Sequence, residues 1–486
     1  MSSHTCIVLG AAAFLLAGCH PAAPEGSLVL TQTPVGVPPS APATVLDVRY
    51  PPGSRVVLLV SPFNTNTVRE LSNGLVAAGN PCVSWDGHWV YFSGKSSSEA
   101  DWQIYKVNAG GGQPEQVTRM AGGAMDPALA AHKELVFSSP VPKAGRLSTA
   151  SEPAALYGQM PGQAPGRLTF GPDSAVDATV LRDGRVLFVT AEARDNGQSP
   201  KHLRLFTINN DGTEVTAYAC QGDGVDFVQR PRELGDGRIA FLAASTEEPG
   251  GKAWAECVKP AAPFATRGSL FAFRGIGCRS VEPISEDNVL ACVETSGWVE
   301  RSMTSHAAVF RIAADATAIG APLFDDPQWN SIEATPVAVR AEPAGHTSAV
   351  TPGAPFGTLL CLNVNDSSEP AADGNRAPAA ELRVYAWVGG GQQRTIGTVP
   401  VDSDGSVIVQ LPVDVPLGLD TLDAQGHVLR HQPAFLWLRS GENRACIGCH
   451  EQPNHAPRNI RPLAAMHGPA HLDLNSPTTA PHTATP

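Results

Sequence analysis

The middle of the chain repeats a unit made of a tight turn and a strongly apolar run. Asp-Gly turns open the segments 85–93, 182–189 and 235–242, and weaker copies occupy 132–138 and 285–292. An Asp-Gly pair supplies a tight turn, and an apolar run behind it is typical of a buried strand. A second strand follows each copy and ends in an aliphatic–aromatic pair: Ile104-Tyr105, Leu156-Tyr157, Leu205-Phe206, Leu270-Phe271 and Val309-Phe310. The pattern predicts a succession of antiparallel β units.

Equivalent strands recur about every fifty residues, which is the length of one four-stranded propeller blade. Five copies are visible, and we expect a sixth blade to close from 329–342 together with the early strand 56–60. The repeat resembles that of TolB-type propellers and covers residues 45–342. A β-sandwich is the alternative, although sandwiches do not usually repeat at this period. The loops at a propeller's rim bind very different partners, so this fold does not name a function.

A second β region follows a Pro/Ala/Ser-rich linker. The linker, 343–380, holds one apolar strand at 358–362, and strand patterning returns at 382–388 and 396–401. Alternation around an Asp-Gly and a Gln-Gly turn then predicts a small antiparallel sandwich over 381–472, with a disordered tail at 473–486. The predicted fold class is all-β: a six-bladed propeller followed by a β-sandwich-like domain.

Composition agrees with a turn-rich β protein. Only 16% of the residues are charged, while Gly (47) and Pro (43) are abundant. The net charge of −12 and the lack of a Lys/Arg cluster argue against a nucleic-acid partner.

The N-terminus carries features of an export signal. The apolar run 7–18 is too short to span a bilayer and ends in Leu16-Ala17-Gly18-Cys19, which resembles the bacterial lipobox. This resemblance predicts a signal peptide at 1–18, diacylation of Cys19 and a tether at 19–44, although the first residues contain no Lys or Arg. A buried helix is the alternative. His20 in place of Asp favours the outer membrane by resemblance to the enterobacterial sorting rule. We therefore expect a lipid-anchored protein on the periplasmic side of a bacterial membrane.

The strongest chemical signal is the pentapeptide Cys446-Ile447-Gly448-Cys449-His450. Two thiols three positions apart can add to the two vinyl groups of one haem, and the next residue supplies an imidazole to the iron. A plain disulfide or half of a zinc site are the alternatives, but zinc requires a second ligand pair and the sequence contains no other CxxC. The motif predicts one covalent haem c on Cys446 and Cys449, with His450 as proximal iron ligand.

The sixth iron ligand stays open among several residues beyond the motif. Met466, His467 and His471 are far enough from His450 for the chain to fold back over a haem, whereas His455 is too close. The alternative is a merely solvated tail. Arg444 and Arg458 are candidate partners of the haem propionates, or surface charges.

The motif lies within a longer ordered string of residues. The order is Pro400-Val401-Asp402-x-Asp404-Gly405-Ser406, Leu422-Asp423-Ala424-x-Gly426, Ser440-Gly441-Glu442, the pentapeptide, and Ala456-Pro457-x-Asn459-x-x-Pro462. It resembles the haem domain of hydrazine synthase alpha-subunit-like proteins, in which a propeller usually precedes. Two departures matter: hydrazine synthesis there depends on more than one haem, and a tyrosine that follows the haem histidine is replaced here by the stretch 452–455. The resemblance therefore implies the domain and the haem, but not the chemistry.

Six further cysteines fit an exported protein. They are Cys82, Cys220, Cys257, Cys278, Cys292 and Cys361, an even number that allows up to three disulfides. Cys278 and Cys292 flank one predicted hairpin and are the preferred pair. Free buried thiols are the alternative.

Three functions remain open from the sequence. The first is a lipid-anchored monohaem electron carrier that uses the propeller to dock a redox partner protein or small molecule. The second is a haem-dependent oxidoreductase with its site between propeller and haem domain. The third is a binding or scaffold lipoprotein. A closed, six-coordinate iron suits the first, and an open iron position suits the second.

Overall fold

The computed structural model describes residues 22–35, 49–141, 153–191, 203–219, 227–244, 253–273, 276–294, 306–367, 377–387, 393–431, 435–448 and 459–474. These residues form strands and three short 3-10 helices, η1 (Thr65–Thr67), η2 (Ala131–Lys133) and η4 (Leu463–Met466). None of the helices in these ranges has the length and apolar character needed to cross a membrane. The all-β class predicted from the sequence is confirmed.

Six antiparallel sheets follow one another along the first two thirds of the described chain. Sheet 1 runs in the order β23 (Trp329–Pro336), β1 (Leu28–Pro34), β2 (Arg55–Leu59), β3 (Val68–Glu70). Sheet 2 runs β4 (Ala77–Val83), β5 (Trp89–Lys95), β6 (Gln103–Asn108), β7 (Glu115–Gln116). Sheet 3 runs β8 (Met125–Leu129), β9 (Leu135–Pro140), β10 (Ala154–Gln159), β11 (Gly166–Arg167).

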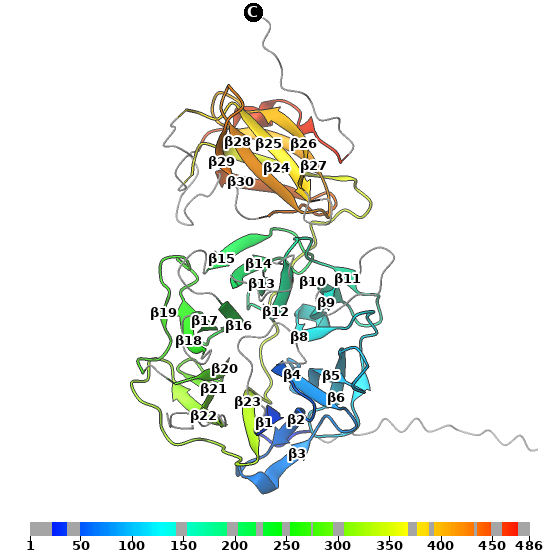
Figure 1. Cartoon of the computed structure of the whole chain (residues 1–486), viewed down its shortest axis with the longest axis vertical. Coiled ribbons are helices and arrows are strands. Elements are labelled where there is room, and N and C mark those ends of the chain that lie inside the picture. Colours follow the sequence, from blue (N-terminus) through cyan, green and yellow to red (C-terminus); the bar gives the residue numbers. More distant parts are fainter. Residues whose placement is uncertain are drawn as a thin grey trace, which may run out of the picture.

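The other three sheets repeat this meander. Sheet 4 runs β12 (Ser174–Val180), β13 (Val186–Ala191), β14 (Leu203–Ile208), β15 (Thr216–Ala219). Sheet 5 runs β16 (Phe227–Glu233), β17 (Ile239–Ala244), β18 (Trp254–Val258), β19 (Gly268–Ser269). Sheet 6 contains β20 (Cys278–Pro283), β21 (Asn288–Glu294) and β22 (Ala307–Ala313). Together the sheets stand in a ring with the first strand of each toward the centre, which is the arrangement of a β-propeller (Figure 1).

The predicted Asp-Gly turns exist and share one geometry. The glycines Gly87, Gly184 and Gly237 have φ of 72°, 90° and 86°, a region that side chains with a Cβ rarely enter. In each turn the aspartate Oδ1 accepts a hydrogen bond from the amide two residues on, as Asp86 does from His88 at 3.0 Å. These local bonds stabilise the turn, so the inner strand and the next strand pair side by side.

The ring closes in a way that differs from the prediction. β1 pairs with β23 (Thr31 opposite Glu333) and with β2 (Leu28 opposite Leu59). The strand predicted at 56–60 therefore shares a sheet with 329–336, but β1 lies between them. β1 falls inside 19–44, so that segment is not a tether throughout. The apolar β1 residues Val29 and Leu30 are fully buried, which explains why this stretch joins the propeller.

A mixed sheet and an antiparallel sheet form the C-terminal sandwich. One runs in the order β30 (Asn443–Gly448), β24 (Phe356–Asn363), β27 (Val407–Pro412), β31 (Ala470–His471). The other runs β26 (Gln393–Pro400), β25 (Glu381–Trp387), β28 (Leu417–Leu422), β29 (Val428–His431). β24 lies within the predicted linker 343–380, and it is a central strand of its sheet. The pairings β24–β30 and β27–β31 are parallel, so the predicted purely antiparallel sandwich is corrected.

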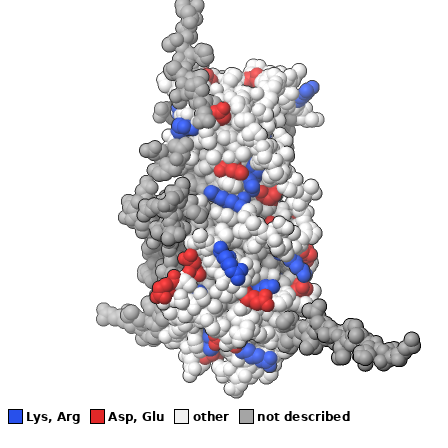
Figure 2. Space-filling view, turned by 90° about the vertical axis from the view of Figure 1, so that its right-hand side faces the viewer, with Lys and Arg blue, Asp and Glu red and all other residues white. Residues whose placement is uncertain are grey.

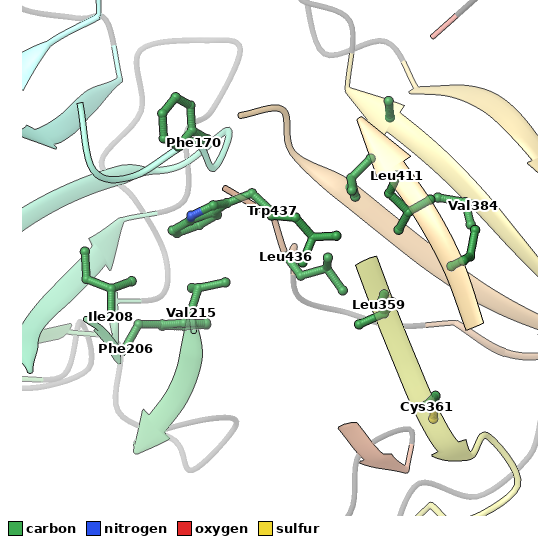
Figure 3. Close-up of a cluster of buried hydrophobic side chains, with 14 of the residues drawn as sticks. Phe170, Phe206, Ile208, Val215, Leu359, Cys361, Val384, Leu411, Leu436 and Trp437 are labelled. Atoms are coloured by element: carbon green, nitrogen blue, oxygen red, sulfur yellow. The ribbon is translucent and has the colours of Figure 1, made fainter. Parts of the chain in front are cut away.

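The core of the sandwich continues into the propeller. One cluster of buried apolar side chains includes Leu359, Val384 and Leu411 from the sandwich and Phe188 and Ile208 from sheet 4. Figure 3 shows Leu436 and Trp437 between these two groups, with Trp437 turned toward Phe170 of the propeller. Burial of a continuous apolar surface stabilises the contact between the two domains.

The preferred disulfide is absent. Cys278 and Cys292 are both free and buried. Although their strands β20 and β21 are neighbours, Cys278 lies opposite Val293 and Cys292 lies opposite Ser280. The two side chains pack into different core clusters, so the prediction from hairpin spacing was wrong. Cys82 and Cys257 are likewise free, and Cys220 lies outside the described residues.

Candidate functional site

Strand β30 carries the first cysteine of the pentapeptide. Cys446 is half-buried, packs against the core cluster shared by the two domains and lies opposite Cys361 of β24 in the parallel register. Asn443 and Ala445 are exposed, whereas Arg444 and Cys446 on the alternate face are partly covered. Cys449 and His450 lie outside the described residues, as do His455, Arg458 and Cys19.

Steric crowding explains why glycine occupies position 448, between the two cysteines. A Cβ at Gly448 would come within 2.2 Å of the backbone oxygen of Asp366. That oxygen belongs to the turn after β24, whose last residue, Asn363, is the register partner of Gly448. The end of β30 therefore lies against its neighbour so closely that no side chain fits at this position.

A tryptophan anchors the segment just before β30 in the propeller. Trp437 is 4% exposed, and its indole Nε1 donates a hydrogen bond to the Gly212 carbonyl oxygen at 2.9 Å. The ring meets Phe170 edge-on with 6.5 Å between ring centroids. Burial of an aromatic ring with its polar atom bonded is a strong and oriented contact.

Charged residues of the same segment complete the contact with sheet 4. Glu442, 1% exposed, accepts hydrogen bonds from the amides of Glu214 (3.0 Å) and Arg439 (2.7 Å). Burial raises the pKa of Glu442, although these two amides act in the opposite direction. Arg439 pairs with Asp414 at 2.8 Å and donates to the Asp211 carbonyl oxygen at 2.5 Å. β30 is thus fixed on the propeller hairpin between β14 and β15.

One guanidinium nitrogen of Arg444 lacks a hydrogen-bond partner among the described residues. Its Nη2 donates to the Val215 carbonyl oxygen, while its Nη1 is buried and lacks a hydrogen-bond partner in the described part of the chain. A buried guanidinium nitrogen without an acceptor is costly. Arg444 is on the same face of β30 as Cys446. An anionic group beside that cysteine would therefore accept a hydrogen bond from the Arg444 Nη1. The donor set therefore fits a haem, whose propionates are such groups.

Two of the candidate sixth ligands come to the same end of the sandwich as the motif. The η4 segment is tied to the turn 402–406, because Leu463 N donates to Asp404 and Ala464 N donates to Ser406. That turn contacts β24 where β24 meets Gly448, through the bond from Val364 N to the Gly405 oxygen. Met466 and His467, which end and follow η4, are therefore near the point from which the chain continues into Cys449.

These two residues differ in availability. Met466 is 64% exposed. The His467 Nε2 bonds Asp402 at 2.9 Å and its Nδ1 bonds the Gly468 oxygen at 3.1 Å. Both contacts raise the pKa of His467. Since both ring nitrogens of His467 are engaged, the thioether of Met466 is the more accessible ligand.

His471 lies at the other edge of the sheet. It belongs to β31, where its register partner is Gln410 of β27, and its ring meets Phe356 edge-on at 4.1 Å. Three strand spacings, about 14 Å, separate β31 from β30. The structure does not bring His471 to Cys446. Nor do any three His, Cys, Asp or Glu side chains form a metal-ligating group within the described ranges.

Sequence reasoning missed a buried layer of charged residues on the propeller axis. Arg49 contacts Asp126 (3.3 Å) and Asp177 (2.8 Å), and Arg230 contacts Glu333 (2.8 Å). Asn80, Asp126, Asp177 and Arg230 all have positive φ and occupy β-bulges of the first strands of sheets 2 to 5. A signal was present: in three of these sheets a proline follows the polar residue, at Pro81, Pro127 and Pro231.

Comparisons with known proteins single out the same region. The family model for the hydrazine synthase alpha subunit middle domain matches residues 366–451, which include β25 to β30 and the whole pentapeptide. The hydrazine synthase subunit alpha of Kuenenia stuttgartiensis is 23% identical and covers 82% of this chain. The chain is thus similar to hydrazine synthase alpha subunits, most specifically over residues 366–451.

One solved structure shares the fold over most of the chain. The Kuenenia stuttgartiensis hydrazine synthase structure, 20% identical, covers 91% of this chain and 71% of its own, with a TM-score of 0.75. TolB from Acinetobacter baumannii is 13% identical and covers 64% of this chain and 66% of its own, with a TM-score of 0.43. The chain spans 63% of the length of the curated relative.

Proposed function

We propose that the chain is a haem-bearing subunit of a redox enzyme complex, and that its single covalent c-type haem transfers electrons. Cys446 and Cys449 would hold the porphyrin through thioethers, and His450 would bind the iron. The observation that carries the proposal is the position of the pentapeptide. Its first three residues end β30, the strand that Trp437 and Glu442 fix to the propeller, inside the segment 366–451 matched by the family model.

The residues of the chain would hold and orient the group. A bound haem c supplies a reversible one-electron change at its iron. Arg444 would neutralise a propionate, using the Nη1 that lacks a partner within the described residues. Met466, near the end of the sandwich where the motif continues, would complete the coordination and close the iron to small molecules. Because β30 is a rigid strand on a packed core, it would limit the structural change around the haem that accompanies each electron transfer.

The similarity to a subunit supports the proposal that this chain assembles with other proteins. The relatives are named as subunit alpha of a hydrazine synthase and as that synthase. We infer that the propeller offers the docking surface for a partner protein. On the face that Figure 2 shows, acidic and basic side chains are interspersed over a mostly uncharged surface. Such a surface suits association with another protein more than with nucleic acid.

The lipobox and the haem motif support a common location. Attachment of c-type haem takes place outside the cytoplasm, and diacylation of Cys19 would hold the mature protein on the periplasmic side of a membrane. We propose this location, with the outer membrane favoured by His20. Release of the protein from membranes by detergent but not by salt is the result that a lipid anchor requires.

A second function, a haem-dependent oxidoreductase, is favoured by one contact. Arg444 reaches from beside Cys446 to Val215 of the propeller, so a haem there would lie near the junction of the two domains. Carbon monoxide distinguishes the two functions. Spectra of the reduced full-length protein should stay unchanged on addition of carbon monoxide if the iron has two ligands. Rapid binding would contradict electron transfer by a closed iron and support the oxidoreductase.

The haem itself is tested with variants. Full-length protein made in a strain competent for cytochrome c maturation should stain for haem on a denaturing gel. The double variant Cys446→Ala/Cys449→Ala should give no stain, while Cys82→Ala, a cysteine of the propeller, should stain like the wild type. A blank lane for the wild type would remove the proposal.

A further inference from the structure

A small polar cavity lies on the axis of the propeller. Its volume is about 60 Å³, and residues from the first strand of all six sheets line it. The polar ones are Cys82, Thr179, Arg232, Glu282, Thr335 and, from the segment after β23, Arg340. A cavity lined by every sheet is the remainder of the central channel, so its position is set by the fold rather than by one loop.

The charged layer described above closes the channel on one side of the cavity. Its residues precede the cavity residues along each strand: Asn80 precedes Cys82, Asp177 precedes Thr179, and Arg230 precedes Arg232. Arg49 and Tyr50 insert among these residues, and the Tyr50 hydroxyl donates to Glu333 at 2.5 Å. With this layer packed and buried, the cavity is reached from the side of Arg340.

The charges that line the cavity do not cancel. Arg232 is paired with Glu282, Nε to Oε2, at 2.7 Å. Glu282 is the one carboxylate among the lining residues, so the second guanidinium, that of Arg340, has no acidic partner there. Burial raises the pKa of the Cys82 thiol, although Arg340 and Arg232 act in the opposite direction. A neutral thiol leaves one net positive charge in the cavity.

Two contacts fix the Arg340 side chain, but one of its N–H groups lacks a hydrogen-bond acceptor within the described residues. Its guanidinium lies over the Trp85 ring, 4.7 Å from the ring centroid, and its Nη2 donates to the Val83 carbonyl oxygen. Its Nε is buried and has no hydrogen-bond partner in the described chain. A buried guanidinium N–H without an acceptor costs free energy that a bound acceptor would recover.

We propose that this axial cavity binds one small monovalent inorganic anion, of the size of a halide, between Arg340 and Arg232. A volume of about 60 Å³ corresponds to roughly two water molecules, which excludes sugar phosphates and carboxylic acids of metabolic size. The hydroxyls of Thr179 and Thr335 offer further donors. The bound anion would also fix the segment 337–340, which leads toward the sandwich.

Thermal unfolding of the full-length protein tests the site with bromide. Bromide is compared with gluconate, an anion too large for the cavity, at equal ionic strength. The wild-type Tm should rise by roughly 2 °C at ten times the Kd and then follow the logarithm of concentration. Arg340→Gln should lose this rise. The matched control is Arg55→Gln, because Arg55 also stacks on a tryptophan, Trp329, but does not line the cavity.

Crystals of the wild type provide a readout that does not depend on a variant's folding. Anomalous scattering from crystals in bromide should place a peak on the propeller axis within hydrogen-bond distance of the Arg340 Nε. An empty cavity would overturn the proposal, and so would an equal Tm rise in gluconate or in Arg340→Gln. A bromide peak could also appear without a Tm rise that Arg340→Gln abolishes. That result would indicate an adventitious ion only and would count against the proposal as well.

Discussion

The indole Nε1 of Trp437 donates a hydrogen bond to the carbonyl oxygen of Gly212, 2.9 Å away, and this bond joins the sandwich to sheet 4 of the propeller. Gly212 sits in a turn with φ of 82°, where a Cβ would meet the Leu168 oxygen at 2.4 Å. The turn therefore depends on glycine, and it presents its carbonyl to the tryptophan. The segment that leads into Cys446 is positioned by this contact.

Trp437→Ala should destabilise the protein by about 3–5 kcal/mol, because it leaves a large cavity between the domains. Trp437→Phe should cost about 1–3 kcal/mol, since it keeps most of the apolar contact but leaves the Gly212 oxygen without its donor. Urea unfolding of the full-length protein measures both. Trp89→Phe, in a half-buried tryptophan of sheet 2, is the matched control. Equal stability of Trp437→Ala and wild type would mean that the domains do not pack as described.

Arg49→Met should destabilise the propeller by about 3–5 kcal/mol at neutral pH, because it leaves Asp126 and Asp177 buried without their cation. Burial alone would raise the pKa of Asp177, but the charges and hydrogen bonds of Arg49 and Arg230 together outweigh burial and hold that pKa below its usual range. Urea midpoints of the variant and the wild type give the difference. The control is Arg55→Met, which removes a half-buried guanidinium paired with Gln32 rather than with a carboxylate.

The cost of Arg49→Met should also depend on pH. In the wild type the depressed pKa of Asp177 gives stability that is present above the unfolded pKa and is lost as pH falls through the folded value. In the variant, burial raises both carboxyl pKa values, so acid relieves the buried charge. The difference between wild type and variant should be smaller at pH 5 than at pH 8. A difference that grows toward acid pH would contradict this account.

Gly448→Ala should displace the end of β30, because its Cβ would meet the Asp366 oxygen at 2.2 Å. We expect a cost of about 1–3 kcal/mol and a lower yield of haem attachment, since Gly448 stands between the two cysteines. Gly468→Ala is the control, with nothing within 4 Å of its Cβ. Haem absorbance per polypeptide measures the yield. An unchanged yield and stability in Gly448→Ala would show that the strand end tolerates a side chain.

Asp402→Asn should lower the pKa of His467, because the carboxylate and the Gly468 carbonyl both raise it in the wild type. A raised pKa stabilises the folded state below the unfolded value near 6.5, and this stability is lost as pH rises through the folded value. The contact of the segment 463–467 with the turn 402–406 should thus weaken as pH rises through the folded pKa of His467. Histidine-selective NMR titration measures the pKa. The control is Asp473→Asn, beside His471, which should leave the pKa of His467 unchanged. An unchanged pKa of His467 in Asp402→Asn would show that the contact between Asp402 and His467 does not exist.

Local patterns were enough to predict the propeller and most of the sandwich. The turns at Gly87, Gly184 and Gly237 are set by residues adjacent in sequence, so the strands on either side of them could be placed. The strands β25 and β26 lie close to the predicted 382–388 and 396–401. The pentapeptide was found for the same reason, because all of its chemistry lies within five residues.

Features that depend on distant partners were missed. β1 reads as part of a tether because its partner, Trp329–Pro336, lies at the other end of the propeller. Arg49 carries no local signal, since its two aspartates come from different sheets. Cys278 and Cys292 were paired by their spacing, whereas the register and the face of each strand decide which side chains meet. His471 was placed with Met466 by sequence distance, but β31 adds to the far edge of the sheet.

The intact mass of the mature full-length protein, purified from a strain with a working cytochrome c maturation system, tests the central claim most directly. We predict a mass that exceeds that of the lipid-modified polypeptide by one haem, and a Cys446→Ala/Cys449→Ala variant that carries the same lipid without this addition. A wild-type mass equal to that of the lipid-modified polypeptide without porphyrin would contradict the claim that this chain is a haem protein.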